Sequence, residues 1–208
     1  MTQQVAKWIY ILNIPIFLLL FLFPERWLAI LFGREFIVGS SVLQILALGA
    51  LFSSVIGVST SLLSIKGRTK LVLLNFIVFA AINLILDIIF VKNYGMIGVA
   101  LATMITQLLF VISALFQVRN TYGFNPVQSK MRRLGFLAVV LLIIGLSLQG
   151  ASSDSLALTV GKSLALLAIY ACGLYIFRIF DAEDKAIIQS IMHKLTKREK
   201  APNDLRKA

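Results

Sequence analysis

The chain has 208 residues, of which 59% are hydrophobic and 14% are charged, and its formal net charge is +11. Soluble domains are about one quarter charged. This composition, with a mean hydropathy of +0.93, therefore excludes an ordinary soluble protein and indicates an integral membrane protein.

Six apolar runs follow one another along the chain, and each is long enough to cross a bilayer. A helix needs about 20 residues to span a hydrocarbon core of roughly 30 Å. Because the runs do not alternate with polar residues, they predict helices and not the strands of a barrel. The expected fold class is all-α, a polytopic membrane protein of six transmembrane helices in one bundle, with spans near residues 8–24, 38–65, 71–91, 96–118, 134–151 and 156–177.

The first run contains Pro15, which removes one helical hydrogen bond and permits a kink. After it, residues 25–36 mix apolar side chains with Arg26 and Arg34. This mixture predicts an interfacial turn or short helix, with Trp27 at the depth of the lipid head groups.

The second run carries small or polar residues at every fourth position, namely Gly49, Ser53, Gly57 and Ser61. Residues four apart share one face of a helix. Small residues let helices approach closely, and serine can form hydrogen bonds between them. The stripe predicts a helix-packing face, which could also be a surface on which helices slide or rock.

The third run places Asn75, Asn83 and Asp87 on one helix face. An ionisable group at the bilayer centre costs at least about 2.5 kcal/mol and usually faces a cavity or a partner. Two interpretations of Asp87 follow. Either it pairs with Lys92 near the outer end of the span, or it binds an ion or a sugar hydroxyl in a water-filled cavity that Asn75 and Asn83 also line.

The fourth run has a second small-residue stripe, formed by Gly98, Ala102 and Thr106. This stripe predicts another close helix contact. Gln107 in this run, and Gln44 in the second, are weaker candidates for the same cavity lining as Asp87.

Short loops predict that the spans pair as antiparallel neighbours. The longest inter-span loop covers residues 119–133. The residues from Asp181 onward predict an amphipathic helix that lies on the membrane surface or packs on the cytoplasmic loops. The expected domains are a six-span bundle over residues 1–180 and a basic cytoplasmic tail helix over residues 181–208.

The basic residues concentrate on one side of this topology. Sixteen of the 20 Lys and Arg residues fall at the amino end, in the second and fourth loops and in the tail, while the other four are Arg26, Arg34, Lys92 and Lys162. The positive-inside rule then predicts that both termini are cytoplasmic. Basic loops suit anionic head groups, so membrane lipids and not nucleic acid are the expected partners.

The sequence contains no catalytic or metal-binding pattern. Its only histidine is His193 in the basic tail, and its only cysteine, Cys172, is expected to be a small apolar packing residue. Gly161-Lys162-Ser163 ends like a phosphate-binding loop but lacks the first glycine and a preceding strand. We therefore expect no enzyme activity, no metal and no cofactor.

An ordered set of residues resembles prokaryotic polysaccharide or lipid-linked oligosaccharide flippases, specifically their carboxyl-terminal lobe. These flippases belong to the multidrug/oligosaccharidyl-lipid/polysaccharide exporter superfamily. The resemblance runs from about residue 15 to residue 117, and the last two spans fit in layout only. The set comprises Leu31-Phe32-Gly33, Lys66-Gly67-Arg68, Asn83, Asp87, Tyr94-Gly95, Gly98-Val99-Ala100 and Ala102-Thr103.

The resemblance implies a plasma-membrane transporter with two helical lobes around a cavity, which turns a lipid-linked sugar between leaflets by alternating access. Such proteins carry about twice as many spans. The chain would therefore be one lobe, as a fragment, a split-gene half or a remnant, and its partner would be a missing amino-terminal lobe or a second chain. Asn75, Asn83 and Asp87 would line the pathway, and the lipid phosphate would contact Lys66, Arg68 and Lys70.

The same residues are compatible with two other functions. The chain could be a lobe of an ion-coupled multidrug exporter, with Asp87 as the ion site. It could also be a non-transporting membrane scaffold that anchors a partner through residues 181–208.

Overall fold

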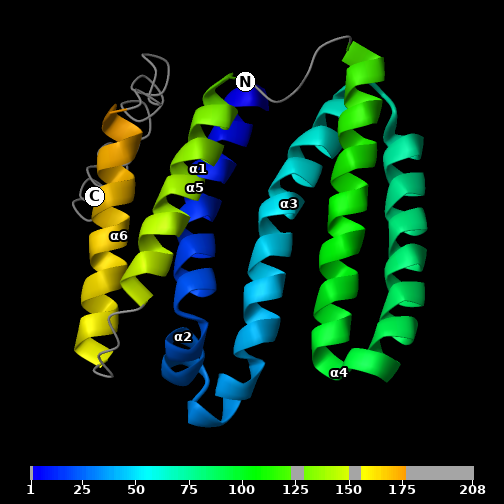
Figure 1. The fold of residues 1–208 in the computed structure, drawn as a ribbon. Helices are drawn as coiled ribbons and strands as arrows, with labels where there is room; N and C mark the ends of the chain where they lie inside the picture. Colours follow the sequence, from blue (N-terminus) through cyan, green and yellow to red (C-terminus); the bar gives the residue numbers. More distant parts are fainter. Residues whose placement is uncertain (1, 123–128, 150–155, 177–208) are drawn as a thin grey trace, which may run out of the picture. The chain divides into compact units, whose positions relative to one another are not determined.

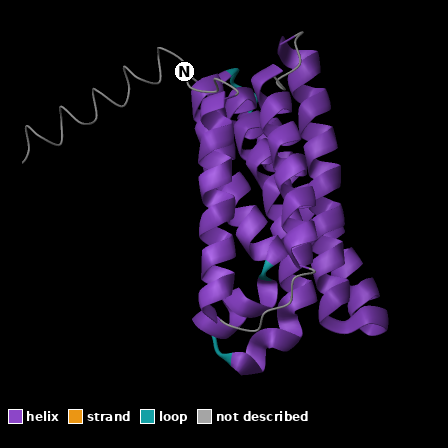
Figure 2. Cartoon of the chain, turned by 60° about the vertical axis from the view of Figure 1, so that its left-hand side comes forward, coloured by secondary structure: helices purple, strands orange, loops and turns teal. Residues whose placement is uncertain are grey.

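The computed structural model describes residues 2–122, 129–149 and 156–176, and every regular element in these ranges is a helix (Figures 1 and 2). The tail helix expected over residues 181–208 lies outside the described residues. The helices are α1 (Thr2–Leu22), α2 (Pro24–Leu31), the 3-10 helix η1 (Arg34–Gly39), α3 (Ser40–Ile65), α4 (Thr69–Tyr122), α5 (Ser129–Gln149) and α6 (Leu156–Ile176).

The chain divides into two compact units, Met1–Tyr170 and Ala171–Ala208. All contacts described below lie within the first unit. Contacts join α1 to α2, α3 and α5, and they join α3 to α2, η1 and α4. A hydrogen bond also joins α6 to α1.

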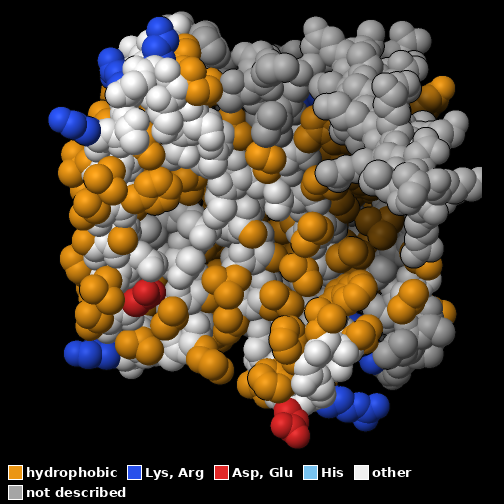
Figure 3. All heavy atoms as spheres, turned by 180° about the vertical axis from the view of Figure 1, so that it is seen from behind, with side chains coloured by type: hydrophobic (Ala, Val, Ile, Leu, Met, Phe, Trp, Pro, Cys, Tyr) orange, Lys and Arg blue, Asp and Glu red, His pale blue; other side chains and the backbone are white. Residues whose placement is uncertain are grey.

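The surface of the described helices is that of a multi-pass membrane protein. Large apolar side chains face outward along α4, where Leu73, Ile85, Ile112 and Phe116 are each more than half exposed. Hydrophobic side chains are spread over the described part of the face in Figure 3, and Lys and Arg side chains lie mainly near its edges. This distribution suits helices whose outer surfaces meet lipid and not water.

The number of spans differs from the expected six. By length and composition, three helices of the described chain can cross a membrane: Arg34–Ile65, Thr69–Tyr122 and Leu158–Ile176. A fourth is reached if α1 and α2 count as one bent span, and Arg133–Ser147 in α5 is a shorter apolar helix. The all-α membrane class is confirmed, whereas the count of six is not.

The chain bends sharply between α1 and α2, by 95°. Pro24 stands in the first turn of α2, where its missing N–H costs no helical hydrogen bond. The short helix expected near residues 25–36 is therefore present as α2 followed by η1. The indole nitrogen of Trp27 is buried and has no hydrogen-bond partner among the described residues.

The end of α3 is set by Gly67, whose φ is +75°. The amide of Arg68 donates to the carbonyl of Leu63 at 3.0 Å, and the amide of Gly67 donates to that of Ser64 at 2.9 Å. These two bonds form a Schellman end, which needs a residue that adopts the left-handed conformation cheaply. The turn leads directly into α4.

Although α4 is a single 54-residue element, it folds back on itself at Gly95, where φ is +56° and ψ is −135°. Residues 69–94 form the first arm and residues 96–122 the second. The arms run antiparallel, since Asn75 contacts Gln117 and Phe79 stacks on Phe110 at 4.6 Å. The two runs expected near residues 71–91 and 96–118 therefore correspond to the two arms of one hairpin (Figure 1).

On the other side of α3, α1 contacts α5 and Tyr170 of α6. A Cβ added at Gly145 in α5 would collide with the side chain of Leu22, so the two helices are in close contact there. The hydroxyl of Tyr170 donates to the carbonyl of Ile11 at 2.9 Å.

Candidate functional site

Two clusters of buried apolar side chains pack α3 against the α4 hairpin. The first contains Ile56, Phe110, Val111 and Ala114. The second lies nearer to Gly67 and contains Leu62, Leu63, Val72 and Val118. Between the same three helical segments, the side chains leave a cavity.

This cavity has a volume of about 440 Å³. Pockets that hold small molecules typically measure about 300–1,000 Å³. The lining comes from α3 and from both arms of α4, and consists of Ser53, Ile56, Gly57, Phe76, Phe79, Ala80, Asn83, Thr103, Thr106, Gln107 and Phe110.

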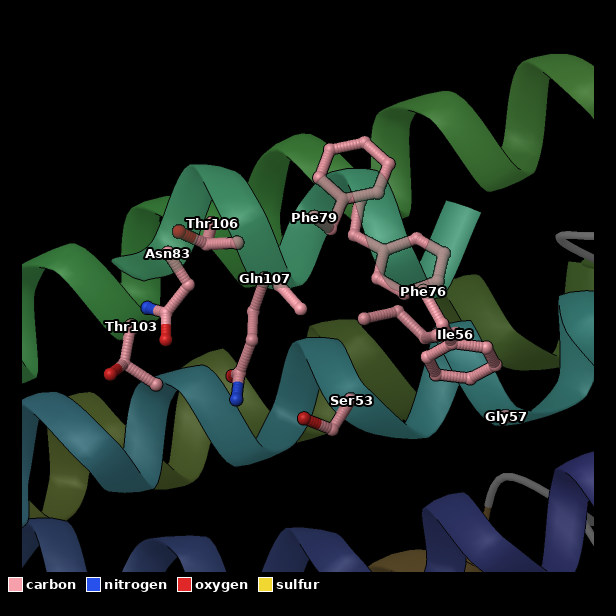
Figure 4. A pocket seen from close by; sticks show the side chains of 11 residues that line it. Ser53, Ile56, Gly57, Phe76, Phe79, Asn83, Thr103, Thr106 and Gln107 are labelled. Atoms are coloured by element: carbon pink, nitrogen blue, oxygen red, sulfur yellow. The ribbon is translucent and has the colours of Figure 1, made fainter. Parts of the chain in front are cut away.

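The cavity has an aromatic end and a polar end (Figure 4). At the aromatic end, the ring of Phe110 stacks on Phe79 and meets Phe76 edge-on at 5.3 Å. At the polar end, nearer to Gly95, Asn83 on the first arm and Gln107 on the second extend toward α3 (Figure 4). No lining residue is charged.

The hydroxyl groups of the polar end are satisfied within their own helices. Thr103 donates to the carbonyl of Val99 at 3.0 Å, and Thr106 donates to that of Ala102 at 2.8 Å. Ser53 contacts the carbonyl of Gly49 at 3.4 Å. Their donors are therefore used, and their oxygens keep acceptor capacity.

The two amides of the polar end are not satisfied. Asn83 Nδ2 and Gln107 Oε1 are both buried, and neither has a hydrogen-bond partner in the part of the chain that the structure describes. One of these atoms is a donor and the other an acceptor. A buried polar atom without a partner costs about 1–3 kcal/mol, so we expect water or another molecule in the cavity to supply the missing hydrogen bonds.

Gly49 explains how Gln107 fits against α3. A Cβ at position 49 would lie 2.5 Å from Gln107 Oε1. The absence of a side chain at this position therefore makes room for the amide. The predicted packing stripe thus divides: Gly49 is buried against α4, Ser53 and Gly57 line the cavity, and Ser61 is exposed.

In the other predicted packing stripe, Gly98 and Ala102 are both buried. A Cβ at Gly98 would collide with the backbone carbonyl group of Phe90 on the first arm. This residue lies where the two arms approach each other next to the turn at Gly95.

Asp87 lies one helical turn beyond Asn83, toward Gly95. Its Oδ1 atom is buried and lacks a hydrogen-bond partner among the described residues, but the residue is not part of the cavity lining. The structure gives no ion pair between Asp87 and Lys92, which are both described. Lys92 is exposed.

Two of the predicted polar residues lie elsewhere. Asn75 is 7% exposed, and its Nδ2 donates to Gln117 Oε1 at 2.7 Å while its Oδ1 accepts from Gln117 Nε2 at 3.0 Å. Gln44 donates to the carbonyl of Phe21 at 2.9 Å, which joins α3 to α1. Neither residue lines the cavity, so the structure brings together only Asn83 and Gln107 of the five predicted lining residues.

The predicted phosphate-contacting residues gather at the Gly67 end of the hairpin. Lys66, Arg68 and Lys70 are all exposed. The ammonium group of Lys66 lies 5.3 Å from the ring centre of Tyr122, close enough for a cation–π contact. The hydroxyl of Tyr122 donates to the carbonyl of Leu62 at 2.8 Å, which ties the end of α4 to the end of α3.

Sequence reasoning missed several residues that shape this region. Gln117 and Ser113, which are hydrogen-bonded to each other, are polar residues inside an apolar run, and that was the available signal for them. Phe79 and Phe110 gave no signal, because an aromatic residue in a span is as typical of lipid contact as of a cavity wall. In the described ranges, no group of three or more His, Cys, Asp or Glu residues could hold a metal ion.

No family model matches the chain. The chain is 27% identical over 134 residues to the probable low-salt glycan biosynthesis flippase Agl15 of Haloferax volcanii, a match that covers 64% of this chain and 28% of that protein. It is 20% identical to MJ1068, an uncharacterised membrane protein of Methanocaldococcus jannaschii, over 94% of this chain and 38% of that protein. The chain thus spans well under half the length of these curated relatives.

Among solved structures, the chain is similar to the lipid II flippase MurJ in an inward closed conformation. The TM-score is 0.69 at 21% sequence identity, and the match covers 86% of this chain and 39% of that protein. At this identity the likeness shows the fold alone. The chain therefore has the fold of part of a lipid II flippase, and the resemblance of its sequence to lipid-linked sugar flippases is confirmed.

Proposed function

We propose that this chain is the carboxyl-terminal lobe of a transporter that flips a lipid-linked oligosaccharide or polysaccharide precursor across the cytoplasmic membrane by alternating access. The observation that carries the proposal is the uncharged cavity between α3 and the two arms of α4, where Asn83 and Gln107 each have one amide atom without a hydrogen-bond partner among the described residues. Support also comes from the similarity to two proteins named as flippases. A second lobe, on the same or another chain, would complete the pathway.

In this proposal the chain crosses the membrane six times and both termini are cytoplasmic. Residues 1–180 form the spanning bundle, and residues 181–208 form a basic tail helix on the cytoplasmic face. The two arms of α4 supply the third and fourth crossings. The turn at Gly67 is then cytoplasmic and the turn at Gly95 faces outward.

Cysteine accessibility tests this topology. In a Cys172→Ser background, Ser64→Cys and Met96→Cys place one thiol near each turn, at exposed positions. We expect a membrane-impermeant maleimide to label the variant at position 96 in intact cells and the variant at position 64 only after permeabilisation. The reverse pattern contradicts the proposed orientation.

The proposed roles follow the ends of the hairpin. Lys66, Arg68 and Lys70 contact the phosphate of the lipid carrier, because exposed basic side chains at the cytoplasmic face attract anionic head groups. Asn83, Asp87 and Gln107 lie on the sugar side. Asn75 and Gln44, whose amides already have partners, hold the helices together.

A flipping assay on the complete transporter in proteoliposomes tests the function. We expect Asp87→Ala to reduce the transport rate of a fluorescent lipid-linked sugar at least about tenfold, which corresponds to about 1.4 kcal/mol. Ser61→Ala is the matched control, because Ser61 is exposed and outside the cavity lining. Unchanged transport by the Asp87 variant removes Asp87 from the mechanism.

A second candidate function is favoured by the unpaired buried oxygen of Asp87. A carboxylate in this state suits a bound cation, as in an ion-coupled exporter of small molecules. Export that depends on an imposed sodium or proton gradient, and loses this dependence in Asp87→Asn, would favour the exporter. Export of the same rate without a gradient would exclude it.

A further inference from the structure

The proline inside α1 leaves one backbone carbonyl of that helix without its usual donor. Pro15 lies in the interior of α1. Because proline has no backbone N–H, the carbonyl of Ile11, four residues earlier, receives no helical hydrogen bond. Ile11 is buried, and a backbone carbonyl within a membrane is strongly destabilised unless another group bonds to it. This carbonyl therefore needs a donor from elsewhere in the protein.

Tyr170 of α6 supplies that donor. Its hydroxyl donates to the carbonyl oxygen of Ile11 at 2.9 Å, in a bond that is fully buried. A phenylalanine would fill the same space, so the hydroxyl alone carries this interaction. The carbonyl that Pro15 frees on one helix is thus the one that a side chain of another helix occupies.

This hydrogen bond joins two helices that otherwise meet sparsely. In the described residues, α1 packs extensively against α3 and α5, whereas none of the helix pairs with extensive backbone contact includes α6. The buried face of α6 carries Ser163, Leu166 and Tyr170, and the Ser163 hydroxyl has no partner among the described residues. The bond between Tyr170 and Ile11 therefore gives α6 a specific point of attachment to α1.

We propose that Pro15 and Tyr170 form a releasable latch that holds α6 against α1. When the two helices separate, the Ile11 carbonyl and the Tyr170 hydroxyl both lose their partner, so the latched state is favoured. The proline strengthens the latch, because a residue with an amide at position 15 would satisfy the same carbonyl in both states. The latch is a property of the chain itself and does not depend on the proposed function.

The other end of α1 provides a contrast. Gln44 of α3 donates to the carbonyl of Phe21 at 2.9 Å. Phe21 lies in the last turn of α1, where carbonyls lack a donor within the helix. Here, however, α1 and α3 also pack extensively, so loss of this one bond should not separate them. The sparse contact with α6 is what makes the bond of Tyr170 a latch.

Distance measurements between spin labels on the full chain in lipid nanodiscs test the latch. In a Cys172→Ser background, Leu12→Cys on α1 and Leu164→Cys on α6 carry the labels at exposed positions. We expect Tyr170→Phe to raise the population with a longer distance between the helices at least about fivefold, as the loss of one hydrogen bond between uncharged groups predicts.

Tyr175→Phe is the matched control for this measurement. It removes the same hydroxyl from an exposed tyrosine of the same helix and should leave the distribution of distances unchanged. If Tyr170→Phe gives the same distribution as Tyr175→Phe, the hydroxyl of Tyr170 does not hold the helices together and the inference is overturned.

Restoring the missing amide distinguishes the latch from ordinary packing of the tyrosine ring. In a Pro15→Ala chain, the amide at position 15 can donate to the carbonyl of Ile11, so Tyr170→Phe should change the population of the longer distance less than about twofold. Pro15→Val restores the same amide with a larger side chain and replaces Pro15→Ala if thermal unfolding shows that the alanine variant is not folded. An equal effect of Tyr170→Phe with and without the proline would mean that Tyr170 does not act through the carbonyl that Pro15 frees, and the inference would fail.

Discussion

The α4 hairpin contains two pairs of amide side chains that differ in their hydrogen bonds. We call Asn75 with Gln117 the paired level, and Asn83 with Gln107 the unpaired level. Near Gly67, the amides of Asn75 and Gln117 donate to and accept from each other. Nearer Gly95, the amides of Asn83 and Gln107 face a cavity, and each has an atom without a partner in the described chain. Each level places one amide on each arm, so only the contact between them differs.

The difference between the two pairs of amides shows that a polar residue in a span need not line a transport pathway. An amide pair that is satisfied between two arms stabilises the hairpin, since interhelical hydrogen bonds in membranes contribute up to about 1–2 kcal/mol. An amide that faces a cavity unpaired adds a cost that a bound molecule can remove. Variants that act differently on the two levels can test this distinction.

The largest effect is expected where the arms meet beside the turn. Gly98→Ala should lower the free energy of unfolding by about 3 kcal/mol, because its Cβ would collide with the backbone of Phe90, which cannot move aside cheaply. This change should disturb both levels, since it shifts the register of the arms. Chemical unfolding of the purified chain in detergent measures it.

Gly57→Ala is the control for this experiment. It adds the same methyl group to a helix, but no atom lies within 4 Å of the new Cβ. We expect the free energy of unfolding to rise by about 0.5–1 kcal/mol, as is usual when alanine replaces glycine in a helix. If Gly57→Ala lowered the free energy of unfolding as much as Gly98→Ala does, crowding beside the turn would not be the cause.

The next largest effect concerns the paired level. Asn75→Leu should destabilise the chain by about 1–2 kcal/mol, because it removes both hydrogen bonds between Asn75 and the half-buried amide of Gln117, which keeps only its bond to Ser113. Adding Gln117→Leu should recover part of the loss, so a double-mutant cycle should give a coupling energy of at least about 0.5 kcal/mol. Strictly additive losses would mean that the pair contributes nothing to hairpin stability.

A smaller effect is expected beyond the paired level, where the end of α4 meets the end of α3. Tyr122→Phe removes the hydroxyl that donates to Leu62 and should cost about 1 kcal/mol. Tyr94→Phe, at a position that is 62% exposed, should cost less than about 0.5 kcal/mol. Thermal unfolding of the two variants side by side checks the contrast, and a reversed order would contradict it.

The smallest effect on stability is expected at the unpaired level. Asn83→Leu should leave the free energy of unfolding within about 0.5 kcal/mol of the wild type or raise it, since the replaced Nδ2 atom has no bond to lose. A loss of stability as large as that of Asn75→Leu would show that Asn83 has a structural partner, and would end the distinction between the two levels.

Sequence alone was sufficient for the class of fold. The apolar runs predicted helices near the positions at which they are found, such as 38–65 for α3 at Ser40–Ile65. Gly95, between two such runs, is the point at which α4 turns back. The predicted number of six spans is not confirmed, because α1 bends by 95° into α2 and the apolar part of α5 is short. A bend does not follow from hydropathy.

The candidate site was predicted only in part. Asn75, Asn83 and Asp87 were placed on one face because they are separated by eight and four residues, which are multiples of four. However, an α-helix has about 3.6 residues per turn, so each step of four rotates the direction by about 40°. Over the three steps from Asn75 to Asp87 the rotation reaches about 120°, which separates a residue that faces Gln117 from residues near the cavity.

The partners across the hairpin could not be predicted at all. They depend on the register of the second arm against the first, which is set by the turn at Gly95 and by the close approach of Gly98 to Phe90. A single sequence does not report the register of two helices. Gln117 is polar and in a span, yet only the register shows that it meets Asn75.

The hairpin shape of α4 also bears on the order in which the protein is built. Its arms are joined by one tight turn, so they can associate with little loss of chain entropy, as soon as residue 122 has been synthesised. We expect the arms to enter the bilayer together, with the amides of Asn75 and Gln117 already shielding each other from hydrocarbon. The hydrogen bonds between Asn75 and Gln117 would then stabilise the hairpin during insertion. Asn83 and Gln107 could therefore enter the membrane before any ligand is bound.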